Sequence, residues 1–281
     1  MTNNSKIGFI GLGNMGKPIF ENLKKKFSYI YCHDKDYSKL GPKFLKKNIS
    51  EIFKDCGVII FCIESNKQII NIIRKNIVKK NTIFIDLTTS LPEETKRITS
   101  YIKKYNSYYI DAAMSGGSSG AKEGSLTLMV GGEKKVFRKV KFILESFSKN
   151  IFYLGESGNG HMMKLLHNSV CHGIFLLNCE ILNIAKSYGI TDTDVINVFN
   201  KSNARSFISE KRFPNNILNG KFNGKSSIKN LKKDLAMINL ILKSSKSKKK
   251  FTKLSNQILS KINNKFNKMD FTIIYKMWDE I

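Results

Sequence analysis

A glycine-rich turn directly after an apolar segment constrains this chain more than any other feature. Residues 6–10 (KIGFI) are mostly apolar, and Gly11-Leu12-Gly13-Asn14-Met15-Gly16 and then a helical pattern over residues 17–26 follow them. The glycines permit a tight turn, close helix packing and a close approach of phosphate to backbone N–H groups. We therefore expect a strand, a turn and a helix whose N-terminus faces a pyrophosphate.

An acidic residue follows the next predicted strand. Residues 29–33 (YIYCH) form that strand, and Asp34 comes directly after it, at about the 20-residue spacing at which a carboxylate accepts hydrogen bonds from an adenosine ribose. We therefore predict dinucleotide binding by Gly11–Gly16 and Asp34; the alternative for Asp34 is an ordinary loop acid. A carboxylate here would repel the additional phosphate of NADP, which favours NAD, but His33 and Lys35 could still accommodate NADP.

Strands and helices continue to alternate up to residue 154. The expected strands are 57–63, 82–87, 108–110, 125–132 and 151–154, and the expected helices are 67–78, 92–104 and 133–147. This order is typical of an α/β protein with a doubly wound parallel sheet. Ligands of such sheets bind beyond the carboxyl ends of the strands, where Thr89 falls. Thr89 is a candidate contact to the ribose near the nicotinamide; alternatively Thr88, Thr89 or Ser90 caps the next helix.

A segment rich in glycine and serine follows Asp111. Residues 112–121 (AAMSGGSSGA) are expected to form a loop. Successive backbone N–H groups at Ser115, Gly116 and Gly117 can form a concave nest for a carboxylate. The alternative is a flexible connector.

The segment 158–170 (GNGHMMKLLHNSV) carries a candidate catalytic lysine. A helix is expected to begin near His161 or Met162, so that Lys164 lies in its first turns and shares a face with Asn168. Positive partial charge at a helix N-terminus disfavours the protonated ammonium, which suits a proton acceptor. In so lysine-rich a chain, the alternative is a solvated surface lysine.

The rest of the chain is predicted to be helical. Residues 170–188 are apolar on almost every face of a helix, which predicts a long buried helix that ends at Gly189. This helix could lie between two domains or two subunits. Further helices are expected at 192–200, 207–218, around Lys233, at 251–263 and at 272–277. We expect a dinucleotide-binding domain over residues 1–160 and an all-helical domain over residues 161–281, joined by the long helix.

The composition limits the partners. The formal net charge is +26, from 48 Lys+Arg against 22 Asp+Glu, but lysines are spread along the whole chain. We interpret this as compositional drift rather than a nucleic-acid surface, and the run 243–250 (KSSKSKKK) as a solvated loop. The five cysteines are scattered, which indicates reduced thiols and no metal site. With no signal peptide and no clean membrane span in the sequence, we expect a cytoplasmic protein.

Four motifs in order give the chain a resemblance to a known family. GFIGLGNMGKP, DAAMSGGSSGAKEGSLTLMVGG (111–132), GNGHMMKLLHN and KDL (233–235) resemble the motifs of the β-hydroxyacid dehydrogenase family. This family includes 3-hydroxyisobutyrate dehydrogenase and tartronate semialdehyde reductase and is related to 6-phosphogluconate dehydrogenase. The resemblance implies a Rossmann-type domain followed by an all-α domain. We also expect a homodimer or homotetramer, because a small all-helical domain usually packs against a neighbour or a second copy.

The resemblance also implies roles for individual residues. Ser115, Gly116 and Gly117 would hold the substrate carboxylate, and Asn168 would bind or orient the substrate. Lys233 would contact substrate and cofactor, and Lys164 would be the general acid/base. The implied reaction is hydride transfer between NAD(P) and a small 3-hydroxy acid, such as 3-hydroxyisobutyrate, or its semialdehyde.

Two alternatives stay open. One is a tartronate or succinic semialdehyde (glyoxylate-type) reductase of the same family, and the other is an inactive relative that binds NAD or nucleic acid. The sequence departs from the family pattern at His167, where a second asparagine is common, and at Ala113-Met114, where Pro-Val is usual. These departures bear on which substrate is used.

Overall fold

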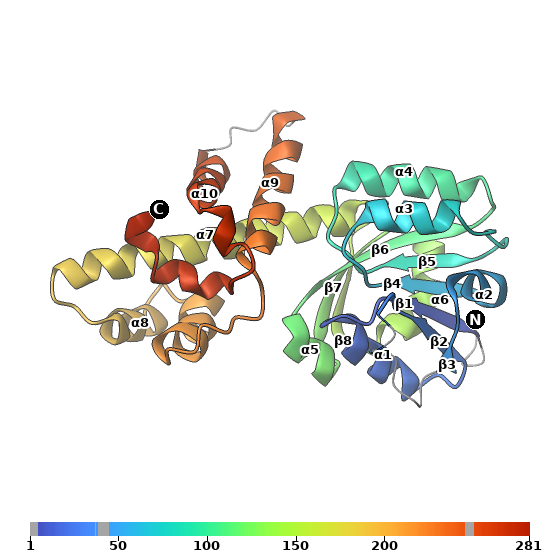
Figure 1. The fold of residues 1–281 in the computed structure, drawn as a ribbon, viewed down its shortest axis with the longest axis horizontal. Coiled ribbons are helices and arrows are strands. Elements are labelled where there is room, and N and C mark those ends of the chain that lie inside the picture. The colour runs from blue at the N-terminus through green and yellow to red at the C-terminus, as the bar shows by residue number, and fades with distance from the viewer. Residues whose placement is uncertain (1–4, 37, 39–44, 245–249) are drawn as a thin grey trace. The chain divides into compact units, whose positions relative to one another are not determined.

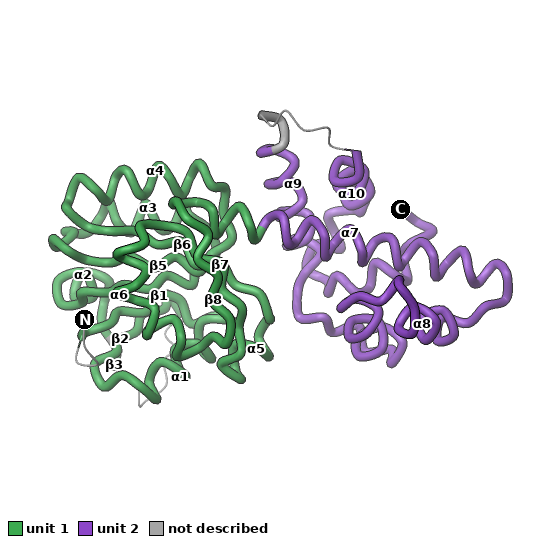
Figure 2. The backbone as a smooth tube through the Cα atoms, turned by 180° about the vertical axis from the view of Figure 1, so that it is seen from behind, with its two compact units in different colours: residues 1–164 green, residues 165–281 purple. Residues whose placement is uncertain are grey.

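The computed structural model describes residues 5–36, 38, 45–244 and 250–281, and the chain divides into two compact units. Unit 1 is Met1–Lys164 and unit 2 is Leu165–Ile281 (Figures 1 and 2). Of the lysine-rich run 243–250, residues 245–249 lie outside the described residues.

Unit 1 is built on an eight-stranded sheet with the order β3-β2-β1-β4-β5-β6-β7-β8. Among the described strands, every neighbouring pair is parallel except β6 and β7. The strands are β1 Ile7–Ile10, β2 Ile30–His33, β3 Leu45–Lys46, β4 Val58–Phe61, β5 Ile83–Asp86, β6 Tyr108–Ser115, β7 Leu126–Gly131 and β8 Ser148–Tyr153. The prediction of an α/β fold with a doubly wound sheet is confirmed. The short strand β3 and helix α2 were not anticipated.

Helices cover both faces of this sheet (Figure 1). The helices of unit 1 are α1 Gly16–Lys24, α2 Ile49–Asp55, α3 Asn66–Arg74, α4 Pro92–Lys103, α5 Gly117–Glu123 and α6 Lys134–Leu144. One hydrophobic core joins the sheet to α1 and α6, and a second joins it to α2, α3 and α4. In β4, Val58 and Ile60 belong to the first core, and Ile59 and Phe61 belong to the second. The alternation of side chains along a strand explains why β4 is apolar at every position.

Strand β6 differs from the sequence-based expectation because it does not stop before Asp111. Asp86, the last residue of β5, pairs with Asp111, and β6 continues for four more residues to Ser115. That extension, about 13 Å at the usual rise of a strand, pairs with the antiparallel β7. The loop predicted for residues 112–121 is therefore wrong: it is strand up to Ser115, and α5 begins at Gly117.

Unit 2 is helical. Helix α7, Asn159–Ser187, begins in unit 1 and continues through unit 2, and its 29 residues span about 43 Å. The other elements are α8 Asp192–Lys201, η2 Ile208–Arg212, η3 Pro214–Leu218, α9 Ile228–Ser244, α10 Lys250–Lys261, η4 Asn264–Phe266, η5 Phe271–Tyr275 and η6 Trp278–Glu280. Phe175 of α7 packs against the rings of Phe213 and Phe271 at centroid distances of 6.1 and 4.9 Å. These aromatic rings form part of the core that unit 2 possesses on its own.

Two expectations for unit 2 need correction. Residues 207–218 form two π-helical segments instead of one α-helix, and the second segment begins at Pro214, which has no N–H group to donate. The C-terminal segment is 3₁₀-helical rather than α-helical.

Helix α7 is less buried than its apolar sequence predicts. Val170, Leu177 and Ile184 are 61%, 45% and 50% exposed. In the described part of the chain, α7 alone is long and apolar enough to span a membrane, but a core helix of a soluble protein passes the same test. Lys164 and Asn168 are polar residues on this same helix.

Candidate active site

Parallel strands bring four sequence-predicted segments to one edge of the sheet in unit 1. The carboxyl ends of β1, β2, β5 and β6 are followed by Gly11, Asp34, Thr89 and Gly116 respectively. The register aligns Ile10 of β1 with His33 of β2 and with Phe61 of β4. The cofactor candidates therefore share the edge at which ligands of such sheets bind.

The glycine turn has the geometry that a bound pyrophosphate requires. Gly11 has φ +102°, and a Cβ there would lie 2.3 Å from the Cys62 carbonyl oxygen. A Cβ at Gly16 would lie 1.9 Å from the Gly11 carbonyl oxygen, whereas a Cβ at Gly13 would meet nothing within 4 Å. Gly11 and Gly16 are needed for the protein's own packing, while Gly13 leaves space open.

No side chain caps the N-terminus of α1. Its N-cap residue is Met15, which makes no side-chain cap hydrogen bond. Backbone N–H groups in the first turn of a helix bind phosphate well when no side chain occupies them. Here the Lys17 and Ile19 N–H groups donate to backbone carbonyl oxygens, so the open space at Gly13 is the feature of this turn that fits a dinucleotide pyrophosphate.

Asp34 is buried, with 6% of its surface exposed, and it supports the glycine turn. Its Oδ2 accepts a hydrogen bond from the Leu12 N–H, and its Oδ1 accepts one from the Asp36 N–H at 2.9 Å. A carboxylate oxygen has lone pairs for more than one donor, so Asp34 can hold the turn and still accept from a ribose hydroxyl.

Thr89 lies half-buried in the loop between β5 and α4. The N-cap residue of α4 is Leu91, which has no side-chain cap, so the capping alternative does not apply to α4. The neighbouring Thr88 donates from its hydroxyl to Asn66 Oδ1 at 3.0 Å and from its N–H to Asp86 Oδ1 at 2.8 Å. Thr88 therefore orders the loop that presents Thr89.

The predicted carboxylate-binding loop follows β6. Gly116 has φ +122° and Gly117 has φ +60°, which are conformations that residues with a Cβ rarely adopt. A Cβ at Gly117 would meet nothing within 4 Å, so the backbone there is open to a ligand. Asn22 of α1 donates to the Ala121 carbonyl oxygen at 2.8 Å, so this hydrogen bond joins α5 to α1.

Lys164 and Asn168 lie one turn apart on α7, as the sequence predicts. Lys164 is half-buried and is the last residue of unit 1, whereas Asn168 is buried in unit 2. Asn168 Nδ2 donates to Asp234 Oδ2 at 2.7 Å, and its Oδ1 lies 3.0 Å from His167 Nδ1. Both ends of the amide are held, so its orientation is defined.

Asp234 of α9 is a functional candidate that the sequence reasoning did not select. Its carboxylate also lies 3.7 Å from Lys233 Nζ and 3.9 Å from His172 Nε2. Lys233 is therefore placed beside the group that orients Asn168. The adjacent Lys-Asp pair in KDL was a signal that could have identified Asp234.

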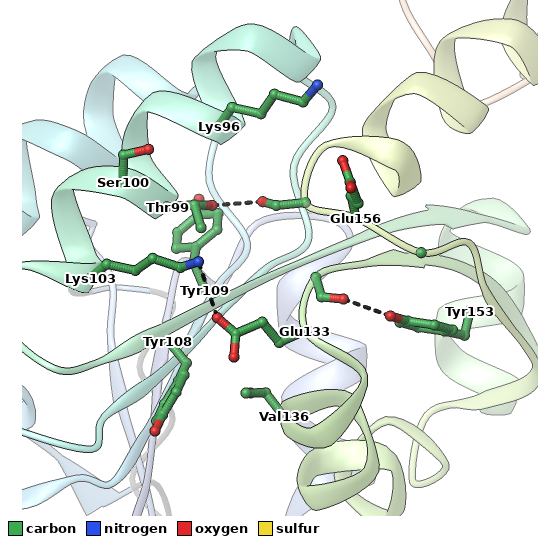
Figure 3. Close-up of a pocket in the computed structure, with 13 residues that line it drawn as sticks. Lys96, Thr99, Ser100, Lys103, Tyr108, Tyr109, Glu133, Val136, Tyr153 and Glu156 are labelled. Atoms are coloured by element: carbon green, nitrogen blue, oxygen red, sulfur yellow. Dashed lines mark hydrogen bonds and ion pairs between the residues drawn. The ribbon is translucent and has the colours of Figure 1, made fainter.

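A cavity of about 580 Å³ in unit 1 holds none of the predicted site residues (Figure 3). Two pairs of its polar groups bond to each other: Lys103 with Glu133 at 3.3 Å and Thr99 with Ser157 at 2.6 Å. The motif residues, rather than this cavity, define the candidate active site.

Comparison with known proteins supports this assignment. Residues 6–155 match the family described as the NAD binding domain of 6-phosphogluconate dehydrogenase. Residues 158–278 match the family described as NAD-binding of NADP-dependent 3-hydroxyisobutyrate dehydrogenase.

Individual relatives agree with the family matches. The chain is 28% identical over 255 residues to 2-(hydroxymethyl)glutarate dehydrogenase of Eubacterium barkeri, covering 84% of this chain and 82% of the relative. It is 26% identical over 299 residues to mouse mitochondrial 3-hydroxyisobutyrate dehydrogenase, covering 98% and 88%. A solved 3-hydroxyisobutyrate dehydrogenase of Mycobacterium tuberculosis has the same fold, with a TM-score of 0.88 at 20% identity, over 98% of this chain and 99% of that one.

Fold, site and relatives define an NAD(P)-dependent oxidoreductase that acts on hydroxy acids. The cofactor is thus NAD(P), as the glycine turn predicts. The chain belongs to the β-hydroxyacid dehydrogenase family.

Proposed function

We propose that this enzyme oxidises a small 3-hydroxy acid of the 3-hydroxyisobutyrate type, or reduces the matching semialdehyde. The observation that carries the proposal is the pair Lys164 and Asn168, one turn apart on α7, with the amide held by Asp234. The names of the relatives, which act on 3-hydroxyisobutyrate and 2-(hydroxymethyl)glutarate, support this substrate class.

We assign the following roles. Gly116 and Gly117 bind the substrate carboxylate through backbone N–H groups in the turn after β6, and Ser115, the last residue of β6, binds it beside them. Asn168 orients the hydroxyl group, and Lys233 contacts substrate and cofactor. Neutral Lys164 accepts the hydroxyl proton during oxidation and returns it during reduction.

When bound, the nicotinamide supplies the hydride acceptor. Gly11–Gly16 and the N-terminus of α1 hold the pyrophosphate, Asp34 holds the adenosine ribose, and Thr89 contacts the ribose near the nicotinamide. Because Asp34 is a buried carboxylate, we propose NAD in preference to NADP.

The test is the initial rate of NADH formation with purified protein across a panel of small 3-hydroxy acids. The reverse rate is measured with the corresponding semialdehydes, including tartronate and succinic semialdehyde. We expect Lys164→Ala to lower turnover by about 10² to 10⁴-fold with little change in the Kd of NAD, because it removes the proton acceptor. Lys141→Ala, the same change in an exposed lysine of α6, is the matched control and should leave the rate unchanged.

Two results would contradict the proposal. Turnover that survives Lys164→Ala would remove this residue from the mechanism. No rate with any acid or semialdehyde, although NAD binds, would favour the inactive relative.

We also propose that the enzyme is a homodimer or homotetramer. The exposed side chains of Val170, Leu177 and Ile184, which recur every seven residues on α7, support this assembly because such a row packs well against another helix. A cytosolic location remains a prediction, since the mouse relative is mitochondrial.

A further inference from the structure

A buried carboxylate holds the start of the helix that carries Lys164. Asp111 of β6 is completely buried. Its Oδ1 accepts a hydrogen bond from the Gly158 N–H at 2.8 Å, and its Oδ2 accepts one from the His161 N–H at 3.0 Å. Helix α7 begins at Asn159, so Gly158 directly precedes the helix and His161 lies in its first turn. Two charge-assisted hydrogen bonds and the positive helix end compensate for burying the carboxylate.

The glycines of this segment make the contact possible. A Cβ at Gly160 would lie 2.8 Å from Asp111 Oδ2 and 2.3 Å from the Met129 carbonyl oxygen. Gly158 has φ +92°, and a Cβ there would lie 3.0 Å from the Pro92 carbonyl oxygen. The two glycines therefore let the first turn of α7 lie directly on the sheet.

The ring of His161 makes a second attachment. It is completely buried, and its Nδ1 lies 2.6 Å from the hydroxyl of Thr95 in α4. Its Nε2 lies 3.7 Å from Asp86 Oδ2 at the end of β5. The Thr95 hydroxyl also donates to the Leu91 carbonyl oxygen at 3.2 Å, so a ring protonated on Nδ1 can donate to Thr95, whereas a ring protonated on Nε2 directs its N–H toward the Asp86 carboxylate.

Asp86 is itself held in place. Its Oδ2 accepts from the Tyr109 hydroxyl at 2.7 Å, and its Oδ1 accepts from the Thr88 N–H at 2.8 Å. Burial, together with the adjacent Asp86 carboxylate, raises the pKa of Tyr109, so this side chain stays a phenol that donates. Two hydrogen bonds thus fix the Asp86 carboxylate that lies 3.7 Å from His161 Nε2.

We propose that Asp111 and His161 are positioning residues for Lys164, which follows His161 by three residues on α7. The proposal rests on the proposed role of Lys164 in proton transfer. Asp111 lies on the same strand as Ser115, four residues before the predicted carboxylate loop. One strand therefore holds both the start of the lysine helix and the loop that binds the substrate carboxylate, and the backbone of β6 sets their spacing.

Asp111→Asn tests the first attachment. The amide retains one acceptor oxygen and presents an NH₂ group to the other backbone N–H, so one of the two hydrogen bonds is lost. We expect kcat to fall about 10- to 100-fold through misplacement of Lys164. The Kd of NAD should change by less than about twofold, because the glycine turn is not involved.

A double-mutant cycle separates positioning from general damage. If Asp111 acts through Lys164, Asp111→Asn should lower the residual rate of Lys164→Ala by less than about twofold. The same fold-loss in both backgrounds would overturn the proposal. Failure of the proposed function has a different signature, because Lys164→Ala would then leave turnover unchanged.

Thr95→Val tests the second attachment in a variant of nearly the same shape, and it keeps the proposal falsifiable where Asp111→Asn does not fold. Removal of the hydroxyl should lower kcat about 3- to 10-fold, and Thr95→Ser, which keeps the hydroxyl, should restore it. A full rate in Thr95→Val would remove His161 from the positioning role.

The control is Asn48→Ala, which removes the capping box of α2. It should lower Tm without changing kcat. A loss of kcat in this control similar to that in Asp111→Asn would mean that loss of any helix cap lowers activity, and the proposal would fall.

Discussion

A methyl group at Gly13 should separate cofactor binding from folding. A Cβ at this position meets no heavy atom within 4 Å, and φ lies outside the left-handed range. Replacing glycine by alanine at an unstrained position stabilises a protein by about 0.4–1 kcal/mol, because alanine restricts the unfolded chain. We expect Gly13→Ala to have a Tm equal to or slightly above that of the wild type.

The same methyl group would occupy the space that the pyrophosphate needs to reach the backbone N–H groups. We expect the Kd of NAD to rise at least about tenfold, which corresponds to about 1.4 kcal/mol of binding free energy.

Gly16→Ala is the informative contrast. Its Cβ would lie 1.9 Å from the Gly11 carbonyl oxygen, and real Cβ atoms essentially never approach closer than 3.0 Å. Helix α1 would have to move away from β1 by 3.0 − 1.9 = 1.1 Å. Overpacking of this kind costs about 1–3 kcal/mol, so Gly16→Ala should lower Tm as well as NAD affinity.

The assay combines thermal unfolding of each variant without cofactor and titration calorimetry with NAD. An unchanged Kd in Gly13→Ala would refute the placement of the pyrophosphate at this turn. A drop in Tm in Gly13→Ala as large as that in Gly16→Ala would refute the packing argument.

Two further substitutions test other residues of the site. Asp34→Ala should weaken NAD more than NADP, because it removes an acceptor for the ribose hydroxyl and a charge that repels the additional phosphate; equal losses in Kd would mean that this carboxylate does not contact the ribose. Asp234→Ala leaves the buried amide of Asn168 without its 2.7 Å acceptor, which costs about 1–3 kcal/mol of stability. In steady-state kinetics, the KM of the hydroxy acid should rise while the KM of NAD stays constant. An unchanged KM of the hydroxy acid would mean that Asn168 does not take part in substrate binding.

Much of unit 1 could be predicted because its signals are local. The apolar runs of β1, β4 and β5, the glycine turn and the acid after β2 each occupy a few consecutive residues, and the structure contains all of these elements. The start of α7 was also predicted to within three residues, because Gly158 and Gly160 precede an apolar run. Such features depend on backbone geometry and side-chain alternation, which a short window of sequence records.

Other features could not be read locally. The extension of β6 to Ser115 depends on pairing with β7. In the sequence, a segment rich in Ala, Ser and Gly resembles a loop, even where distant residues pair with it as a strand. Residues 207–218 have a helical pattern, but they form two π-helical segments, and Phe213 between them packs against the distant Phe175 at 6.1 Å. In both cases tertiary contacts outweigh local propensity.

The sequence by itself determined the class of fold, the cofactor turn and the order of the motifs, since each is encoded by adjacent residues whose chemistry is explicit. Only the tertiary structure decided that Asp111 caps the helix of Lys164, that His161 contacts Thr95 and that Asp234 holds Asn168. These partners are 50, 66 and 66 residues apart in the chain. Their contacts exist because the sheet and the helices bring distant segments together, and a buried polar group must then find its hydrogen-bond partner among whatever residues the fold places beside it.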